Sequence, residues 1–383
     1  MTEHQHPKGD LPASTAIRQE QLPASPRLTM PAILQRARAR HSYEEFFEAR
    51  ISNPHTRRAY KLTVDRFLDW CDRQGAELAT ITPAMCGRFR DQIQGSAATK
   101  KRALAALRRF FDLLTERHFC LVNPARSTTN VQERVEEGKT PELPPKDVRQ
   151  LFASIDETTV VGLRDRAILA VMAATGCRVG AVAKLRIGSF SYQGGQWHLR
   201  LSEKNAKTRT VPVRHDLQQL VLAYLHAAGI ADHPHDHAMF RTAQGRTGHL
   251  TPYCPEEHND VGERVAPERG ALGPDEMRQM LKRRLVDAGL GRRVVTHSAP
   301  DARGRSRTRV RYESDYSPHS FRVMVATDLL AQGKDIHDVA YVLGHSSTRT
   351  TQVYDRNKRK VSRNLVESIR VHLGTEVLPP DEE

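Results

Sequence analysis

The chain has 383 residues, and its 59 lysines and arginines outnumber 45 aspartates and glutamates to give a net charge of +14. At roughly 150 residues per domain this length predicts two or three domains, and the basic excess indicates a polyanionic partner or an anionic membrane surface. The absence of any run of about 18 apolar residues argues against a membrane span, and the five scattered cysteines and the lack of a glycine-rich phosphate loop argue against a disulfide scaffold, a zinc ribbon and a nucleotide cofactor.

The first third of the chain divides into a polar arm and a helical domain. Residues 1–42 are polar, with scattered proline and glutamine, and predict a mostly disordered arm that turns helical near 32–40. Residues 43–125 have apolar side chains at helical spacing, and Thr82-Pro83 and Ser96 are typical helix starts. The helix that begins near Ser96 carries basic side chains on its polar face. We expect its first turns to contact DNA phosphates through Thr99, Lys100, Lys101 and Arg102.

A polar linker over 126–142 precedes a second domain over 143–375, and residues 376–383 form an acidic tail. In this domain the pattern predicts helices over 163–174, 179–185, 217–227, 276–288, 321–331 and 335–343, and two short strands over 196–202 and 208–213. The stretches 252–272 and 291–313 read as irregular insertions, because Gly304 and Ser306 interrupt any regular pattern in the second one. The predicted fold class is mainly α with a small β-sheet.

Four fragments of the second domain carry a chemical pattern through their order and spacing. They are Thr175-Gly176-Cys177-Arg178, the run from Lys204 to Arg209, Pro318-His319-Ser320-Phe321-Arg322, and Leu343-Gly344-His345 with Tyr354 nine residues later. Together they resemble the tyrosine recombinase (phage integrase) family, whose catalytic set has the order Arg, Lys, His-xx-Arg, His, Tyr. The helical region 43–125 resembles the family's core-binding (SAM-like) domain, which implies a two-domain, C-shaped DNA clamp.

The resemblance implies that DNA is cut and rejoined without a metal or nucleotide cofactor. Tyr354 would attack the phosphodiester and form a covalent 3′-phosphotyrosine, which conserves the energy of the broken bond. Arg178 and Arg322 would clamp the non-bridging oxygens of the pentavalent transition state, where negative charge is spread.

The remaining members of the set handle protons and hold the phosphate. Lys204 would protonate the leaving 5′ oxygen. Lys207 is close enough in sequence to be the alternative proton donor. His319 would accept the tyrosine proton or hold the phosphate, and His345 would bind a phosphate oxygen. One position departs from the family pattern: the acidic residue usual three positions after the first arginine is Ala181 here. Either another carboxylate substitutes for it or this support is absent.

Further basic residues are expected on the DNA. Lys207 and Arg209 lie on the predicted hairpin, and the stretch 291–313 runs directly into Pro318-His319, so we expect it to follow the DNA backbone as a cationic loop. The arginines assigned to that contact are Arg303, Arg305, Arg307 and Arg309. The alternating histidines from His233 to His237 and the pair Cys254 and His258 resemble solvated loop more than a metal site, and no metal is expected.

The expected partners follow from the family. They are a double-stranded recombination site with inverted repeats and three further copies of the chain in a tetrameric synapse, with residues 361–373 packing on a neighbour. A bacterial protein of the cytoplasm and nucleoid, encoded by a mobile genetic element, fits this role. Two alternatives remain at this point: a type IB topoisomerase, which relaxes DNA as a monomer, and a DNA-binding regulator that has lost catalysis.

Overall fold

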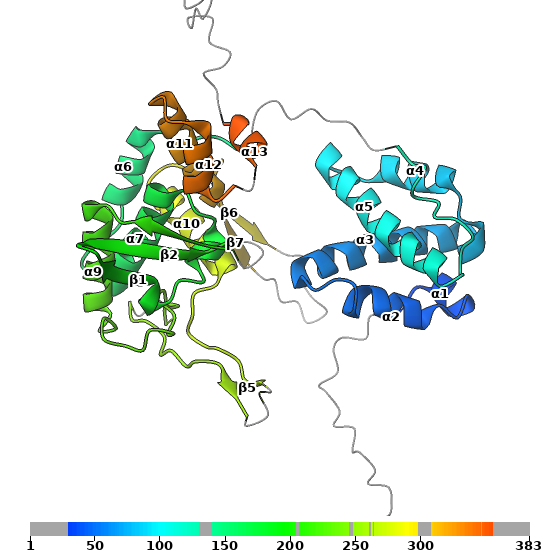
Figure 1. The fold of residues 1–383 in the computed structure, drawn as a ribbon, viewed down its shortest axis with the longest axis horizontal. Helices are drawn as coiled ribbons and strands as arrows, with labels where there is room; N and C mark the ends of the chain where they lie inside the picture. The colour runs from blue at the N-terminus through cyan, green and yellow to red at the C-terminus, as the bar shows by residue number, and fades with distance from the viewer. Residues whose placement is uncertain are drawn as a thin grey trace, which may run out of the picture. The chain divides into compact units, whose positions relative to one another are not determined.

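The computed structural model describes residues 30–129, 140–203, 207–244, 248–259, 262, 264–297, 308–345 and 347–354. The chain divides into two compact units, Met1–Arg134 and Val135–Glu383 (Figure 1). This division lies inside the linker that the sequence predicts over 126–142. Within the described ranges, no helix has the length and apolar character that crossing a membrane requires.

The first unit consists of helices, and side chains cap the starts of its three longest ones. Its elements are α1 (Ala32–Arg36), α2 (Arg40–Glu48), α3 (Pro54–Arg73), the 3₁₀ helix η1 (Leu78–Thr80), α4 (Pro83–Gln92) and α5 (Ala97–Glu116). Thr82 accepts a hydrogen bond from the Met85 amide, and Ser96 accepts one from the Thr99 amide, so both predicted helix starts are confirmed. Edge-to-face contacts among phenylalanines, including Phe67 with Phe111 at 5.9 Å, fill the core.

The arm turns helical at α1, within the stretch 32–40 where the sequence predicts it, but this helix also joins the core of the unit. Ile33 and Leu34 are 1% and 0% exposed and belong to the same core as Phe46 and Phe67. Residues 30–42 are therefore part of the helical unit and not of a disordered arm. The polar composition of the whole arm concealed two apolar residues that a short helix turns inward.

The second unit surrounds a long buried helix. Its elements are α6 (Pro145–Ala153), α7 (Val160–Thr175), α8 (Val179–Val182), η2 (Ile187–Ser189), β1 (Phe190–Gln193), β2 (Gln196–Ser202), β3 (Thr208–Pro212), α9 (His215–Ala227), β4 (Glu257–His258), β5 (Arg264–Ala266), α10 (Pro274–Asp287), β6 (Arg292–His297), β7 (Thr308–Glu313), α11 (Pro318–Ala331), α12 (Ile336–Leu343) and α13 (Thr348–Gln352). Strands β1, β2 and β3 form one antiparallel sheet in chain order. The predicted fold class, mainly α with small sheets, is confirmed.

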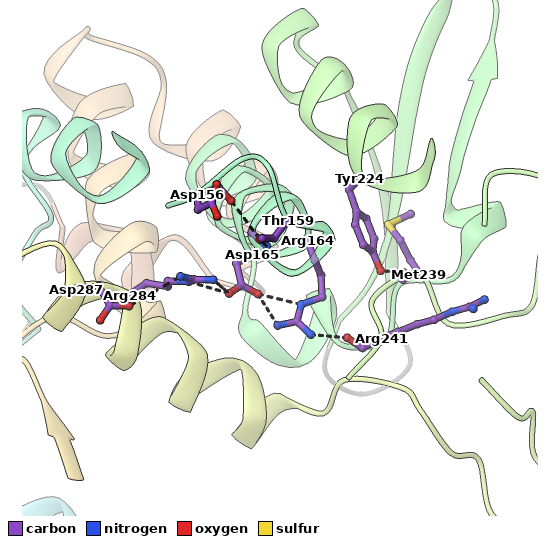
Figure 2. A network of polar contacts seen from close by, with 10 residues as sticks. Asp156, Thr159, Arg164, Asp165, Tyr224, Met239, Arg241, Arg284 and Asp287 are labelled. Atoms are coloured by element: carbon purple, nitrogen blue, oxygen red, sulfur yellow. Dashed lines mark hydrogen bonds and ion pairs between the residues drawn. The ribbon is translucent and has the colours of Figure 1, made fainter. Parts of the chain in front are cut away.

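A charged network inside this unit ties α7 to α10 (Figure 2). The Arg164 guanidinium donates two hydrogen bonds to Oδ1 of Asp165, at 2.9 and 2.6 Å, and a third to the Arg241 carbonyl. Arg284, from α10, donates to the other carboxylate oxygen of Asp165 at 2.9 Å. Asp165 thus compensates two arginines, of which Arg164 has a side chain only 2% exposed. The network fixes the helix that ends at the predicted catalytic turn.

Asp165→Ala should lower the free energy of unfolding of this unit by about 3–5 kcal/mol, because it leaves the buried Arg164 charge without a partner. The chain has two tryptophans, so a Trp70→Phe background makes Trp197 the reporter of the second unit during urea unfolding. Asp216→Ala is the matched control, since its pair with Arg214 is exposed and should change stability by at most about 1 kcal/mol. A loss equal to that of the control would mean that the buried network contributes nothing.

The arginine-rich stretch 291–313 was expected to be a loop, and this expectation is wrong for its two ends. Strands β6 and β7 pair in antiparallel register, with Arg292 opposite Glu313 and Val295 opposite Val310. In β7 the arginines alternate with threonine, valine and tyrosine, and β6 contains two valines and a threonine, all of which favour extended backbone. The count of charges concealed these residues. Residues 298–307, which include Gly304 and Ser306, lie outside the described residues. The other insertion, 252–272, contains the short β4–β5 pair and is otherwise irregular.

Candidate active site

Two left-handed glycines bring the predicted catalytic fragments together. Gly176 ends α7 with φ +58°, and a Cβ atom there would lie 2.7 Å from Cδ2 of Leu343 in α12. Gly344 ends α12 in the same conformation, with φ +66°. Other residues rarely adopt this backbone, so both turns favour glycine, and at Gly176 a side chain would also crowd Leu343. The end of α7 therefore packs against the end of α12, and α11 packs against both helices (Figure 1).

Arg322 is the buried arginine of the site. It lies on the second turn of α11, its residue is 1% exposed, and its guanidinium donates a hydrogen bond to the Gly176 carbonyl at 2.9 Å. Its second terminal nitrogen is buried and has no hydrogen-bond partner among the residues that the structure describes. Burial lowers the pKa of Arg322 to about 10, and the charge of Arg178 adds to this fall. The side chain is still cationic at pH 7 and has donor capacity that a phosphate oxygen would fill.

Tyr354 lies between the two predicted catalytic histidines. Its hydroxyl oxygen is 3.1 Å from Nε2 of His319, and its ring stacks on the His345 ring with the planes 6° apart. Tyr354 is 6% exposed, and His345 is held in turn by a 2.8 Å contact from Nδ1 to the Thr351 hydroxyl. The hydroxyl that would attack is therefore already in hydrogen-bond reach of a base.

Burial and the positive charge of the site both favour neutral imidazoles. Burial, together with the charges of Arg322 and Arg178, lowers the pKa of His345 to about 3. Desolvation and the same arginines lower the pKa of His319. A neutral His319 is able to accept a proton from Tyr354. The excess of positive charge also means that an anion entering the site would be strongly favoured.

Glu203 is a member of the site that the sequence analysis did not identify. It is 7% exposed, and its carboxylate accepts hydrogen bonds from Arg178 at 2.9 Å and from Arg209 at 3.3 Å. The alternation along strand β2 could have revealed that Glu203 is buried, because Glu203 continues the inward-facing positions of Leu199 and Leu201. An acidic residue in phase with buried leucines needs a buried cationic partner.

The structure therefore brings most of the predicted catalytic set into one place. The residues that it gathers are Arg178, His319, Arg322, His345 and Tyr354. Lys204 lies outside the described residues, between Glu203 and Lys207, whose backbones are joined by a 2.6 Å hydrogen bond. Lys207 is exposed as expected of a DNA contact, whereas Arg209 is 9% exposed and points inward.

The other predicted DNA contacts lie on separate surfaces. Thr99 and Arg102 line a groove of about 590 Å³ in the first unit, and exposed Arg66 and Arg73 of α3 line it as well. The sequence analysis missed the last two, although residues 62, 66, 69 and 73 share one helix face by their spacing. Lys100 and Lys101 follow Thr99 on α5.

The arginines assigned to the second insertion are only partly described. Arg309 is exposed on β7, and Arg303, Arg305 and Arg307 lie outside the described residues. Of the alternating histidines, at which no metal site was expected, His233 contacts Arg241 at 3.1 Å and His237 packs on Tyr253. These histidines are thus engaged with protein side chains.

The chain is similar to known proteins in both sequence and fold. The chain is 28% identical over 318 residues to the tyrosine recombinase XerC of Myxococcus xanthus, an alignment that covers 79% of this chain and 87% of that protein. Its fold is similar to that of the XerH site-specific recombinase in a post-cleavage complex with a palindromic difH substrate, with a TM-score of 0.55, 18% identity, and coverage of 81% and 80% of the two chains. It is also similar to a lambda integrase tetramer bound to a Holliday junction, with a TM-score of 0.55, 14% identity, and coverage of 85% and 78%.

The family assignment covers both units. Residues 42–118 match the phage integrase N-terminal SAM-like domain, and residues 141–360 match the phage integrase family itself. The second match alone extends over more than half of the chain. The chain therefore belongs to the phage integrase family, the tyrosine recombinases, and is a site-specific DNA recombinase.

Proposed function

We propose that this recombinase cuts and rejoins DNA through a covalent 3′-phosphotyrosine on Tyr354. The observation that carries the proposal is the 3.1 Å contact between the Tyr354 hydroxyl and His319 in a site that contains Arg178 and Arg322. The tyrosine oxygen bonds to phosphorus, its proton passes to His319, and the bond to the 5′ oxygen breaks. Attack by the 5′ hydroxyl of a second strand then releases the tyrosine.

A nicked suicide substrate tests this function directly. Cleavage near the nick releases a short oligonucleotide that carries the 5′ hydroxyl, so the covalent complex accumulates and survives denaturant. The wild-type protein should produce that adduct without added metal or nucleotide. Its absence on every DNA site derived from the flanks of the gene would argue for the regulator that has lost catalysis.

Lys204→Ala should cleave a 5′-bridging phosphorothiolate far faster than ordinary DNA, by about 100-fold or more. The sulfur leaves as a stable thiolate and needs little help from an acid, so this substrate compensates for the loss of the proton donor. Lys207→Ala is the matched control and should show no such preference. Equal defects of Lys204→Ala on both substrates would assign Lys204 to binding.

The contacts to DNA are proposed to come from both units. In the first unit they are the groove with Thr99 and Arg102 and the neighbouring Lys100 and Lys101, where basic side chains meet a concave surface. In the second unit they are Lys207 and the β6–β7 hairpin, on which Arg293 and Arg309 are exposed and have no acidic partner among the described residues. A two-stranded ribbon of this kind is narrow enough for a DNA groove.

Replacing Arg303, Arg305, Arg307 and Arg309 with glutamine should weaken specific and non-specific DNA binding alike. It should also flatten the dependence of log K on log salt by up to about four contacts, at roughly 0.9 per phosphate. Fluorescence anisotropy at several salt concentrations measures both effects. An unchanged slope would reject the contact, and loss of discrimination between sites with an unchanged slope would mean that the hairpin reads bases.

The assembly is proposed to be a tetramer on two sites with inverted repeats. Support comes from the XerH complex with a palindromic substrate and from the lambda integrase tetramer on a Holliday junction. The family match argues against topoisomerase IB activity, and native mass on DNA separates a tetramer from a monomer. Residues 361–373, proposed to pack on a neighbour, lie outside the described residues. Action at the bacterial nucleoid, on a mobile element, is part of the same proposal.

A further inference from the structure

We propose that Glu203 positions Arg178 for catalysis and so replaces the carboxylate that is missing at Ala181. The inference rests on the proposed active site. Ala181 is 3% exposed within α8, and its methyl group cannot accept a hydrogen bond from an arginine. Among the residues that the structure describes, the acidic partner of Arg178 is Glu203.

The contact geometry suits a positioning role. Oε2 of Glu203 accepts one hydrogen bond from a terminal nitrogen of Arg178 at 2.9 Å, and 43% of the Arg178 side chain is exposed. The carboxylate therefore holds one edge of the guanidinium while the rest is accessible to a phosphate. Oε1 accepts from Arg209 at 3.3 Å, so the carboxylate is itself fixed from the β3 side.

Glu203 also contacts a third catalytic fragment. A Cβ atom at Gly344 would lie 3.2 Å from Oε1 of Glu203, so the turn that precedes His345 packs directly on this carboxylate. Glu203 is the last described residue before Lys204, and its amide is bonded to the Lys207 carbonyl. One carboxylate thus joins the turn of Arg178, the hairpin of Lys204 and the turn of His345.

The charges of the site require a carboxylate at this place. Arg178, Arg209 and Arg322 lie close enough to repel one another. Burial is the main cause that lowers the pKa of Arg322, the charges of Arg178 and Arg209 add to it, and Glu203 opposes it. Three guanidiniums and one carboxylate leave two positive charges, which is enough to attract a phosphodiester. Without Glu203, Arg178 would lose its fixed partner and move away from the other arginines, because they repel it.

Glu203→Gln separates positioning from folding. The amide has nearly the same volume but no charge, and it offers one acceptor oxygen where the carboxylate offers two to Arg178 and Arg209. Arg178 is therefore held less firmly, and the single-turnover cleavage rate at saturating DNA should fall about 100-fold. The dissociation constant for DNA should stay the same or decrease, because the site gains one positive charge. Glu268→Gln is the matched control: Glu268 pairs with Arg186 in the same unit, and its loss should leave the cleavage rate unchanged.

Glu203→Asp keeps the charge on a shorter side chain and should cleave at a rate between those of the wild type and Glu203→Gln. Wild-type cleavage by Glu203→Gln would overturn the inference, and so would a loss of rate explained by weaker DNA binding. If Glu203→Gln melts at a much lower temperature, Glu203→Asp decides, since wild-type cleavage by that variant would overturn the inference too. Failure of the proposed function is a different result, because then the wild type forms no adduct or Tyr354→Phe still forms one.

Discussion

Tyr354→Phe should form no covalent protein–DNA adduct and should bind DNA with the affinity of the wild type. Phenylalanine lacks the oxygen that bonds to phosphorus, so the loss is complete and not a reduction in rate. The variant keeps the aromatic ring, which stacks on His345 in the buried site, and it removes only the hydrogen bond to His319. A nicked suicide substrate and a denaturing gel measure the adduct, and anisotropy measures the affinity.

Tyr341→Phe is the control for this experiment. Tyr341 lies on α12, close to the catalytic turn in sequence, but its residue is 67% exposed. It should form adduct at the wild-type rate. If Tyr354→Phe still yields an adduct that resists denaturant, the nucleophile is another residue, and mapping the modified peptide identifies it.

The clustering of the proposed catalytic residues was predictable because four fragments had to agree in order and spacing. Each fragment alone is common in a chain with 18 histidines and a large excess of arginine. Gly176 and Gly344 explain why the residue sequences of two fragments are informative. Both turns need a residue with left-handed backbone, and the residue at position 176 also needs to be small. The glycines in these two fragments therefore indicate tight turns that few other residues would allow.

Other features escaped the sequence analysis for physical reasons. Glu203 and Arg178 are 25 residues apart in the chain. The alternation along one strand indicates that Glu203 is buried but does not indicate which residue of another element contacts it. The β6–β7 hairpin was missed because arginine is a poor indicator of extended structure, although valine and threonine alternate with it. The burial of Ile33 and Leu34 was not predicted, although a helix was expected near 32–40, because that helix has only five residues.

Arg178→Ala and Arg322→Ala should each lower the cleavage rate by about 1,000-fold, because each removes a donor that faces charge developing in the transition state. Their effects on stability should differ. Arg178 is exposed and is not enclosed by the core, so its removal should leave the melting temperature nearly unchanged. Arg322 is 1% exposed, and its loss leaves the Gly176 carbonyl without its donor. That unsatisfied group should cost about 1–3 kcal/mol.

Comparing the two variants separates the effect of each arginine on transition-state stabilisation from its effect on folding. Single-turnover cleavage and thermal melting of both proteins are measured together, with Arg214→Ala as a control because Arg214 pairs with Asp216 on an exposed surface. A clamp requires that Arg178→Ala, which folds normally, still loses about three orders of magnitude in rate. Near-normal cleavage by Arg178→Ala would remove it from the clamp. In that case Arg322 and the unpartnered donors of Arg209 would have to hold the phosphate, and the same assay on Arg209→Gln would then show the larger loss.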